Sequence, residues 1–279
     1  MSFDFMAFLV LATLITGSVW LADVLVSARR QPEANTASAT PRRMPSRRGS
    51  RSAEYARALF PVLLLVLGVR AFVVEPFTIP SNSMLPTLYT GDFILVNKFA
   101  YGLRLPIADT TLIPLGVPRR GDVAVFAFPQ DPSIDYIKRI VALPDDLVDY
   151  RDKTLYINGT PQPQRPVARF VGMGAAGEMS GAELVSENLD ERSHQILVRT
   201  QAPNLKPGCN ILAAGPIRVP ETHYFVLGDN RDGSNDSRCF GFVPDSHLRG
   251  KAFFVWMHWD ATRPTELPIA FERIGQVVR

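Results

Sequence analysis

Two neighbouring apolar stretches, DVAVFAF at residues 122–128 and YIKRIVAL at 136–143, decide the predicted fold. Both are short and rich in β-branched and aromatic residues, a composition that is typical of β-strands. Gly121-Asp122 begins the first stretch and Pro144-Asp145 follows the second, and such pairs favour turns. The two stretches are therefore predicted to be strands bounded by turns.

The same composition recurs on both sides of this pair. Asn158-Gly159 is the dipeptide that two-residue hairpin turns prefer, and it follows an apolar run directly. Helical periodicity is scarce beyond residue 75, with one weak candidate at 181–192. We therefore predict a mainly β, mostly antiparallel domain over 75–149 and 220–279. Its further strands are expected at 92–99 (DFILVNKF), 154–157 (TLYI), 224–227 and 251–259 (KAFFVWMHW).

Residues 150–219 have a looser pattern and are predicted to be an inserted subdomain. They contain GMGAAG at 172–177, which formally matches the GxGxxG turn of dinucleotide-binding proteins. That turn requires a strand before it, a helix after it and a parallel return strand. Because no such βαβ unit follows, we interpret 172–177 as a flexible loop and expect no nucleotide cofactor.

Two apolar runs near the N-terminus are predicted to span a membrane. Phe5–Val26 is long enough to cross a hydrocarbon core of about 30 Å. Asp4 precedes it without any basic residue, whereas a cleaved signal peptide needs a basic start. The second run is Ala58–Val74, with Pro61 near its start, where the missing N–H is tolerated. The expected divisions are 1–26, a loop at 27–57, and a second span at 58–74.

The positive charge is concentrated in this N-terminal part. Residues 1–57 hold eight Arg and four acidic residues, net +4, and the rest of the chain is net −1. A folded nucleic-acid-binding domain would carry the positive excess itself, so no nucleic-acid partner is expected. Arg-rich loops between spans mark the cytoplasmic side of a membrane. The domain beyond Glu75 is therefore predicted to lie outside the cytoplasm, next to membrane lipid.

Composition also limits the chemistry. The 279 residues are 46% hydrophobic and 20% charged, which excludes a disordered chain. Cys209 and Cys239 are the only cysteines and form no CxxC pair, and the four His show no HxxxH or HExxH spacing. We therefore expect no metal and no cofactor. The two cysteines either form one disulfide or remain free thiols, and the sequence does not choose.

A lysine on a predicted strand is the candidate for general base. Alternation along 136–143 places Tyr136, Lys138 and Ile140 on one face of the strand. An inward-facing lysine needs a lowered pKa to accept a proton, and burial supplies that shift. The competing interpretation is an exposed edge strand, because Arg139 is adjacent. The Pro-rich segment 76–86 carries the candidate nucleophiles Ser81 and Ser83, although serines in such turns often only bond to backbone.

The third motif, GDNRDGSNDSR at 228–238, alternates charged residues with turn formers. A calcium loop of the EF-hand kind needs a Glu at its twelfth position, and none is present. The interleaved arginines would also repel a cation. We therefore interpret the segment as a salt-bridged loop in which Arg–carboxylate pairs hold Ser234 in place.

Four motifs in order, IPSNSMLPTL (79–88), RRGDVAVF (119–126), DYIKRIVALPDD (135–146) and GDNRDGSNDSR (228–238), resemble those of bacterial type I signal peptidases. Two spans with a basic loop between them are similar too. The resemblance covers nearly the whole chain and is weakest in 1–57 and 150–219. It implies a multi-pass protease of the cytoplasmic membrane with a β-rich extracytoplasmic (periplasmic) catalytic domain and an inserted β subdomain. Its expected substrates are exported preproteins that carry signal peptides.

The resemblance also assigns roles to single residues. Ser83 is the expected nucleophile and Lys138 the general base, with the Ser83 backbone N–H and the Ser81 hydroxyl as oxyanion hole. Ser234 is expected to orient the Lys138 amine. The remaining matches are supporting residues (Asp229, Asp236 and Arg238) and residues that line shallow pockets for small side chains (Phe77, Ile79, Leu88, Tyr136 and Ile137).

Some positions depart from the family pattern. Asn82 stands between the two serines where Gly is frequent, and Asp145 stands in LPDD where LPGD is common. Both Asn and Asp tolerate positive φ, so neither change disturbs the expected turns. Apolar side chains near the spans, such as Phe77 and Met84, are expected to dip into lipid.

Two other functions compete with this one. A related Ser–Lys protease that cleaves itself would usually carry a DNA-binding domain, and none is recognisable in the sequence. A catalytically inert membrane-tethered binding module would have no need of Ser83 or Lys138, and both are present.

Overall fold

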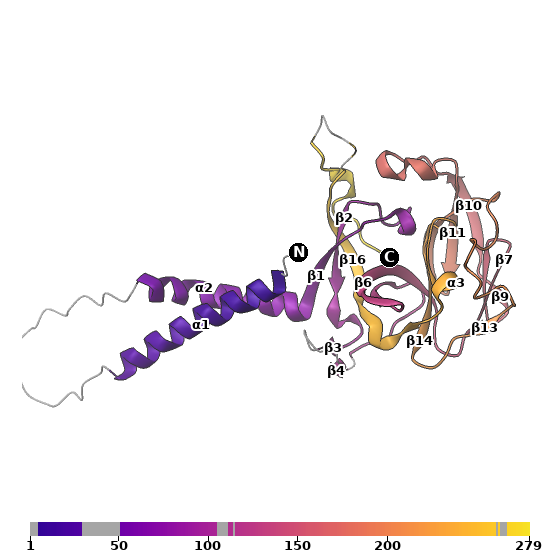
Figure 1. Ribbon diagram of the computed structural model, residues 1–279. Helices are drawn as coiled ribbons and strands as arrows, with labels where there is room; N and C mark the ends of the chain where they lie inside the picture. The colour runs from indigo at the N-terminus through magenta and orange to yellow at the C-terminus, as the bar shows by residue number, and fades with distance from the viewer. Residues whose placement is uncertain (1–4, 30–50, 105–110, 114, 261, 263–266) are drawn as a thin grey trace, which may run out of the picture. The chain divides into compact units, whose positions relative to one another are not determined.

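The computed structural model describes residues 5–29, 51–104, 111–113, 115–260, 262 and 267–279 (Figure 1). The chain divides into two compact units, Met1–Ala71 and Phe72–Arg279. The first unit is helical and the second is mainly β, as the strand patterns predicted.

The first unit pairs two helices, α1 (Phe5–Arg29) and α2 (Arg51–Gly68). Trp20 stacks on Phe60 at 5.4 Å between ring centroids, and Arg57 donates to Asp23 at 2.8 Å. A Cβ on Gly17 would come within 2.7 Å of the Phe60 ring, so glycine allows this close approach. Aromatic packing and the Arg57–Asp23 ion pair are thus among the contacts that hold the two helices together.

The helix bounds correct two sequence predictions. The predicted loop 27–57 is helical at both ends, because α1 continues to Arg29 and α2 begins at Arg51; its centre lies outside the described residues. The second prediction that differs is the span at 58–74: α2 ends at Gly68, a π-helical turn covers Val69–Val73, and Val74 already belongs to a strand. Among the described helices, one segment, Ala7–Ala28, is long and apolar enough to cross a membrane.

A seven-stranded antiparallel sheet forms the centre of the second unit (Figure 1). β1 lies at one edge of this sheet, and the short β15 lies at the other. In spatial order its strands are β1 (Val74–Thr78), β2 (Asp92–Asn97), β16 (Leu248–His258), β5 (Val123–Phe128), β6 (Asp131–Ala142), β14 (His223–Leu227) and β15 (Val243–Pro244).

The predicted strands are confirmed, with shifts of a few residues at their ends. β6 begins at Asp131, five residues earlier than predicted; its first half is exposed and its second half is buried. Asn158 and Gly159 both have positive φ, 53° and 79°, as the predicted hairpin turn requires. Asp145 also has a positive φ, 69°, as expected at the LPDD turn.

Residues 147–218 contribute two smaller sheets. The weak helix prediction at 181–192 is wrong, because β11, β12 and the turn between them occupy these residues. Buried and less buried side chains alternate along β11, and this strand pattern outweighed the helical spacing. One sheet contains β10 (Gln164–Arg169), β11 (Glu183–Leu189) and β12 (Arg192–Val198). The other contains β13 (Ile217–Arg218), β7 (Leu147–Arg151), β8 (Thr154–Ile157) and β9 (Thr160–Pro161), and a separate pair is β3 (Leu103–Arg104) with β4 (Thr111–Ile113).

The glycine-rich segment contains a short helix where the sequence predicted a loop. Gly174–Met179 forms a 3-10 helix in which Ala176 and Met179 are buried. The strands on either side, β10 and β11, pair antiparallel, so the parallel unit of a dinucleotide site is not formed.

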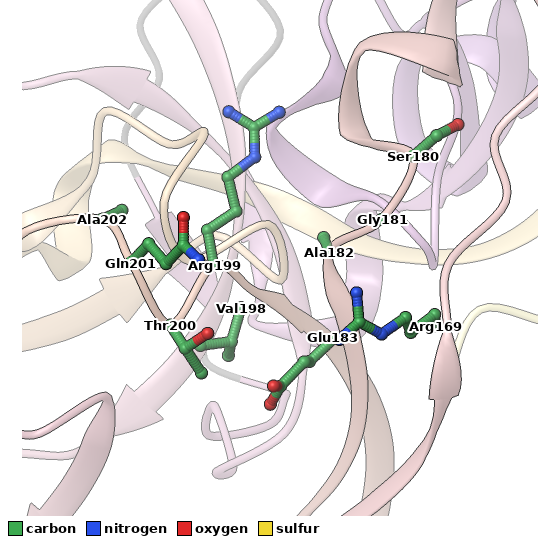
Figure 2. A pocket seen from close by; sticks show the side chains of 10 residues that line it. All are labelled: Arg169, Ser180, Gly181, Ala182, Glu183, Val198, Arg199, Thr200, Gln201 and Ala202. Atoms are coloured by element: carbon green, nitrogen blue, oxygen red, sulfur yellow. The ribbon is translucent and has the colours of Figure 1, made fainter.

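The β10–β11–β12 sheet ends beside an open cavity of about 520 Å³ (Figure 2). Arg169 and Glu183 lie on one wall, and Arg199 with Thr200 and Gln201 lies on the other (Figure 2). The sequence left open whether the two cysteines are bridged, and the structure decides it. Cys209 and Cys239 form a disulfide that ties the segment after β12 to the short helix α3 (Ser237–Phe240).

Candidate active site

Ser83 lies on a short 3-10 helix, Asn82–Met84, that follows edge strand β1. Ser83 is buried, with 8% of the residue exposed. The Asn230 backbone N–H donates to the Ser83 carbonyl at 3.1 Å, and the Asn230 side chain donates to the Asn82 carbonyl at 3.0 Å. The 228–238 loop therefore fixes the backbone of the serine turn from one side.

Lys138 reaches this serine from the buried half of β6. Its Nζ donates to Ser83 Oγ at 2.8 Å and to the Ile137 carbonyl at 2.8 Å. Lys138 is 4% exposed and Arg139 is 1% exposed. The edge-strand interpretation of Lys138 is therefore wrong, because β5 and β14 cover β6 on its two sides.

Burial lowers the pKa of Lys138 to about 8, against the opposing charges of Asp236 and Asp229. The negative charge of each of those carboxylates is balanced by an arginine. Asp229 pairs with Arg139 at 2.6 Å, and Asp236 pairs with Arg238 at 2.8 Å. Because each acid has its own guanidinium partner, the lysine keeps a pKa at which a neutral amine is accessible.

The 228–238 loop is the salt-bridged loop that the sequence predicted. Asp236 caps α3 through the Arg238 N–H and accepts a bond from the Gly228 N–H at 3.0 Å. Gly228 is required to be glycine, since a Cβ there would lie 2.3 Å from Ser234 Oγ and 2.6 Å from the Ser83 carbonyl oxygen. The loop thus packs its backbone directly against the serine turn.

Ser234 is fully buried next to Gly228, but its hydroxyl is not among the hydrogen-bond partners that the described residues give Lys138. The Ser81 hydroxyl donates to Ser83 Oγ at 3.3 Å. The structure therefore gathers Ser81, Ser83 and Lys138 in one bonded chain, with Ser234 beside it.

The sequence of this chain is similar to a known protein family. The family model for signal peptidases, peptidase S26, matches residues 52–259. The chain belongs to this family. Signal peptidase I of Pseudomonas aeruginosa is 40% identical over 99% of this chain and 100% of its own length. Signal peptidase I of Pseudomonas fluorescens is 41% identical over 99% of this chain and 100% of its own length.

A signal peptidase I from Enterococcus faecalis is a solved structure with 32% identity, covering 48% of this chain and 96% of that chain with a TM-score of 0.29. Membership of the S26 family makes this protein a serine peptidase of the signal peptidase group. The S26 family is described as signal peptidases, in agreement with the resemblance of the four motifs.

The predicted pocket residues of this S26 peptidase fall on two faces of β6. Ile137 packs with Ile79 and Leu88 in one apolar cluster, and Phe77 lies against that cluster. Tyr136 lies on the other face and stacks on Phe128 at 4.4 Å between ring centroids. Leu88 is fully buried, and so is Met84, which corrects the expectation that Met84 dips into lipid.

Asn82, which stands between the two serines, has no need of the positive φ that Asn tolerates. It begins the 3-10 helix and is absent from the described non-glycine residues with positive φ. Its side chain instead bonds to the inserted region, a role that the turn chemistry of the motif did not suggest.

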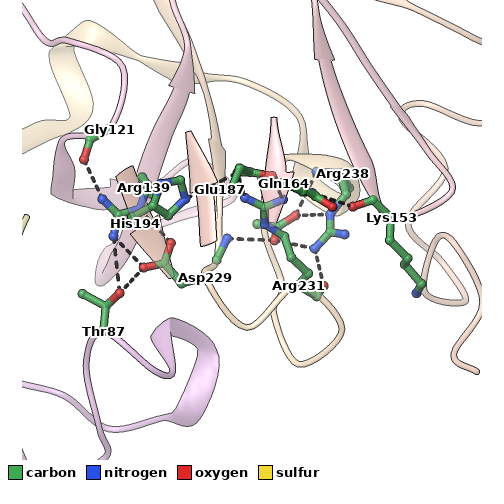
Figure 3. A network of polar contacts seen from close by, with 12 residues as sticks. Thr87, Gly121, Arg139, Lys153, Gln164, Glu187, His194, Asp229, Arg231 and Arg238 are labelled. Carbon is green, nitrogen blue, oxygen red and sulfur yellow. Dashed lines mark hydrogen bonds and ion pairs between the residues drawn. The ribbon is translucent and has the colours of Figure 1, made fainter. Parts of the chain in front are cut away.

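A buried ion network behind the site was missed by the sequence interpretation (Figure 3). Arg139 of β6 donates hydrogen bonds to Asp229, Thr87 and the Gly121 carbonyl, which lie in segments that connect strands of the seven-stranded sheet. Arg231 pairs with Glu187 of β11, which also accepts a bond from Gln164 at 2.9 Å. Burial opposes the charge of Glu187, but the Arg231 guanidinium beside it holds its pKa below the usual range. The alternating Arg and Asp of the motif were the only sequence signal.

His194 lies 3.4 Å from Glu187 and is 7% exposed. Burial lowers its pKa, and the nearby Arg139 charge acts in the same direction. No group of three or more His, Cys, Asp or Glu within the described ranges is placed to hold a metal ion.

Proposed function

We propose that this protein is a membrane-bound serine endopeptidase that removes N-terminal signal peptides from exported preproteins with a Ser83–Lys138 dyad. The observation that carries the proposal is the 2.8 Å contact between Lys138 Nζ and Ser83 Oγ in a buried site. Nucleophile and base within hydrogen-bond reach are the signature of an activated serine.

The two halves of the reaction, formation of an ester on Ser83 and its hydrolysis, follow from this contact. Neutral Lys138 accepts the Ser83 hydroxyl proton while Ser83 Oγ attacks the carbonyl carbon of the scissile peptide. The resulting ammonium then donates that proton to the leaving amine nitrogen as the C–N bond breaks. The signal peptide is left as an ester on Ser83. A water molecule, deprotonated by Lys138, cleaves the ester and restores the hydroxyl.

Three further groups serve the same steps. The Ser83 N–H and the Ser81 hydroxyl stabilise the oxyanion of the tetrahedral intermediate, for which the 3.3 Å approach of Ser81 to Ser83 Oγ gives support. Ser234, buried beside the dyad, orients the Lys138 amine when substrate is bound. Asp229, Asp236 and Arg238 hold the loop that supports these groups.

The substrate segment before the cut binds as an added strand. β1 is the edge strand of its sheet, and Pro76 within it is tolerated there because an edge strand lacks one set of partners. An extended peptide gains backbone hydrogen bonds along such an edge. Phe77, Ile79, Leu88, Tyr136 and Ile137 shape the pockets, and large side chains around them favour small residues in the substrate.

Membrane attachment completes the proposal. α1 supplies one span, and the shorter apolar part of α2 with the following turn supplies a second. The Arg-rich segment between them lies on the cytoplasmic side, so the β unit lies on the extracytoplasmic side. Trp256 and Trp259, 40% and 48% exposed on and just beyond β16, are amphipathic side chains suited to a lipid interface.

Cleavage of a purified precursor tests the proposal. The full-length protein in detergent or lipid is expected to cut an exported-protein precursor once, after a small residue, as read by gel and N-terminal sequencing of the product. The same precursor with Trp in place of that small residue should be cut at least about 100-fold more slowly, because enlarging the pocket would strain the packed side chains around it. Equal cutting of both precursors, or no cutting of several precursors by folded protein, would contradict the proposal.

The pH dependence tests the lysine base separately. With a pKa of about 8 for Lys138, kcat/KM should rise about tenfold per pH unit below pH 8 and become level above it. The sign follows from the chemistry, since only the neutral amine accepts a proton. Initial rates at low substrate, with thermal unfolding checked at each pH, provide the measurement. A flat profile from pH 6 to 10 would argue against Lys138 as the base.

A further inference from the structure

The inserted region forms a closed loop next to the serine turn. The Phe170 N–H donates to the Ala182 carbonyl and the Gly181 N–H donates to the Phe170 carbonyl, both at 2.8 Å. Within that base, the Ser180 hydroxyl accepts from the Gly172 N–H at 3.0 Å. A Cβ on Gly172 would lie 2.1 Å from the Ala176 carbonyl oxygen, so the loop closes only with glycine there. Hydrogen bonds between 170–172 and 180–182 therefore close the 172–180 loop at its base.

Apolar packing joins this loop to the serine turn. Leu85, two residues after Ser83, is fully buried in one cluster with Ala176 and Met179 of the loop. Leu197 of β12 belongs to the same cluster, and its backbone bonds to Asp229 and Arg231. The loop thus packs against the serine turn and, through β12, against the 228–238 loop.

Asn82 adds a polar link at the point nearest to the nucleophile. Its Nδ2 donates to the Ala175 carbonyl at 2.6 Å and to Glu178 Oε1 at 2.8 Å. Its Oδ1 accepts from the Thr90 hydroxyl at 2.8 Å. The Ala175 carbonyl can only accept, so it fixes which end of the amide faces the loop. Three hydrogen bonds therefore hold a side chain adjacent in sequence to Ser83.

The serine turn needs such support, because it is short. The 3-10 helix Asn82–Met84 has three residues, and its N-cap Ser81 makes no side-chain capping bond. Asn230 holds the backbone carbonyls of Asn82 and Ser83 on one side. The side-chain bonds of Asn82 hold the turn from the side of the inserted region.

We propose that Asn82 is a positioning residue through which the 172–180 loop sets the orientation of Ser83. The proposal rests on the proposed function, because its readout is peptide-bond cleavage by Ser83. In this chain the inserted region then affects the rate of cleavage, through the contacts that Ala175 and Glu178 make with Asn82. Asn82 itself does not touch Lys138 or the substrate's scissile bond in this role.

Asn82→Ala is expected to lower kcat about tenfold and to leave KM within about twofold. The expected loss is confined to kcat because Asn82 orients the nucleophile, and a misplacement of an ångström lowers the rate steeply without changing substrate binding. Glu178→Ala removes one of the three hydrogen bonds of the Asn82 side chain by changing an exposed residue, and should lower kcat about threefold. Since Glu178 is exposed, this second variant is expected to fold even if Asn82→Ala does not.

A charge-exchange pair separates positioning from a general loss of stability. Asn82→Asp places a carboxylate against Glu178 and the Ala175 carbonyl, and should lower kcat about 100-fold. Glu178→Gln alone should be near wild type, since its amide oxygen still accepts from Asn82. Together, the two changes should recover about tenfold of the loss, because the new amide donates to the new carboxylate. Glu191→Gln, an exposed carboxylate in the β11–β12 turn, is the matched control and should rescue nothing.

The outcomes distinguish the two proposals. If the wild-type protein cuts no precursor, the proposed function fails and this inference with it. If the wild-type protein cuts, but Asn82→Ala and Glu178→Ala keep wild-type kcat, only the positioning role is overturned. An equally large rescue by Glu191→Gln would also overturn it, since the effect would then be one of overall charge.

Discussion

Lys138→Met and Ser83→Ala should each slow precursor cleavage at least about 1,000-fold, because either change removes one member of the proposed nucleophile–base pair. Met has nearly the length of Lys and fills the same buried space without an amine. Lys138→Arg keeps a positive charge that cannot be removed near pH 8, and should be equally inactive. The measurement is the initial rate of product formation from one precursor, with wild-type protein purified in parallel.

Stability provides the control for this prediction. A buried amine whose pKa falls from 10.5 to about 8 on folding disfavours the folded state by about 3 kcal/mol while it is charged. This penalty is complete below pH 8 and fades as pH rises toward 10.5. Lys138→Met should therefore unfold at a higher temperature than wild type at pH 7, with the difference shrinking above pH 8. Inactivity accompanied by a lower unfolding temperature would indicate misfolding rather than loss of the base, and retained activity would contradict the dyad.

Glu187→Gln should destabilise the protein by about 3 kcal/mol or more, because it leaves a buried guanidinium without its counter-charge. Arg231 and Glu187 are both fully buried, and Arg231 Nη1 donates to Glu187 Oε1 at 2.8 Å. Gln has the same shape as Glu, so no cavity accompanies the loss of charge. For a chain of this size the unfolding temperature should fall on the order of 10 °C.

Asp190→Asn is the matched control in the same hairpin. Asp190 is 58% exposed and pairs with Arg120 at 2.9 Å, and its φ of 52° suits Asn as well as Asp. A surface pair of this kind contributes about 0–1 kcal/mol. The prediction for Glu187 would be wrong if both variants unfolded within about 2 °C of each other. Because Arg231 follows Asn230, the Glu187 variant should also lose activity as the serine turn loosens.

The ion network connects the inserted region to the 228–238 loop, which supports the serine turn. β12 bonds to the 228–238 loop through Leu197, and Glu187 of β11 pairs with Arg231 of that loop. A buried pair is weak evidence for stability as such, since desolvation offsets much of its attraction. The directional hydrogen bonds of the Arg231–Glu187 pair do fix which residues of the 228–238 loop and of the inserted region are in contact. The serine turn therefore depends on residues that are more than 80 positions away in sequence.

The local sequence determined the strands and the pairing of charges within the 228–238 motif. β-branched and aromatic runs predicted the strands of the central sheet, and Asn158-Gly159 predicted the β8–β9 hairpin of the four-stranded sheet, because these preferences act between neighbouring residues. Alternation along 136–143 placed Lys138 with Tyr136, whose ring centroid lies 5.3 Å from Nζ. The motif at 228–238 predicted Arg–carboxylate pairing, and Asp236 with Arg238 confirms it.

Only the tertiary structure decided which groups meet across the chain. The burial of Lys138 depends on the strands on either side of β6, and the Arg231–Glu187 and Asn82–Ala175 contacts join segments with no local relation. The helix prediction at 181–192 failed for the same reason, since pairing with β10 decided the conformation there. Local preferences amount to tenths of a kcal/mol per residue, whereas burial and long-range pairing contribute several, so partners distant in sequence decide both the pKa of the lysine and the support of the serine.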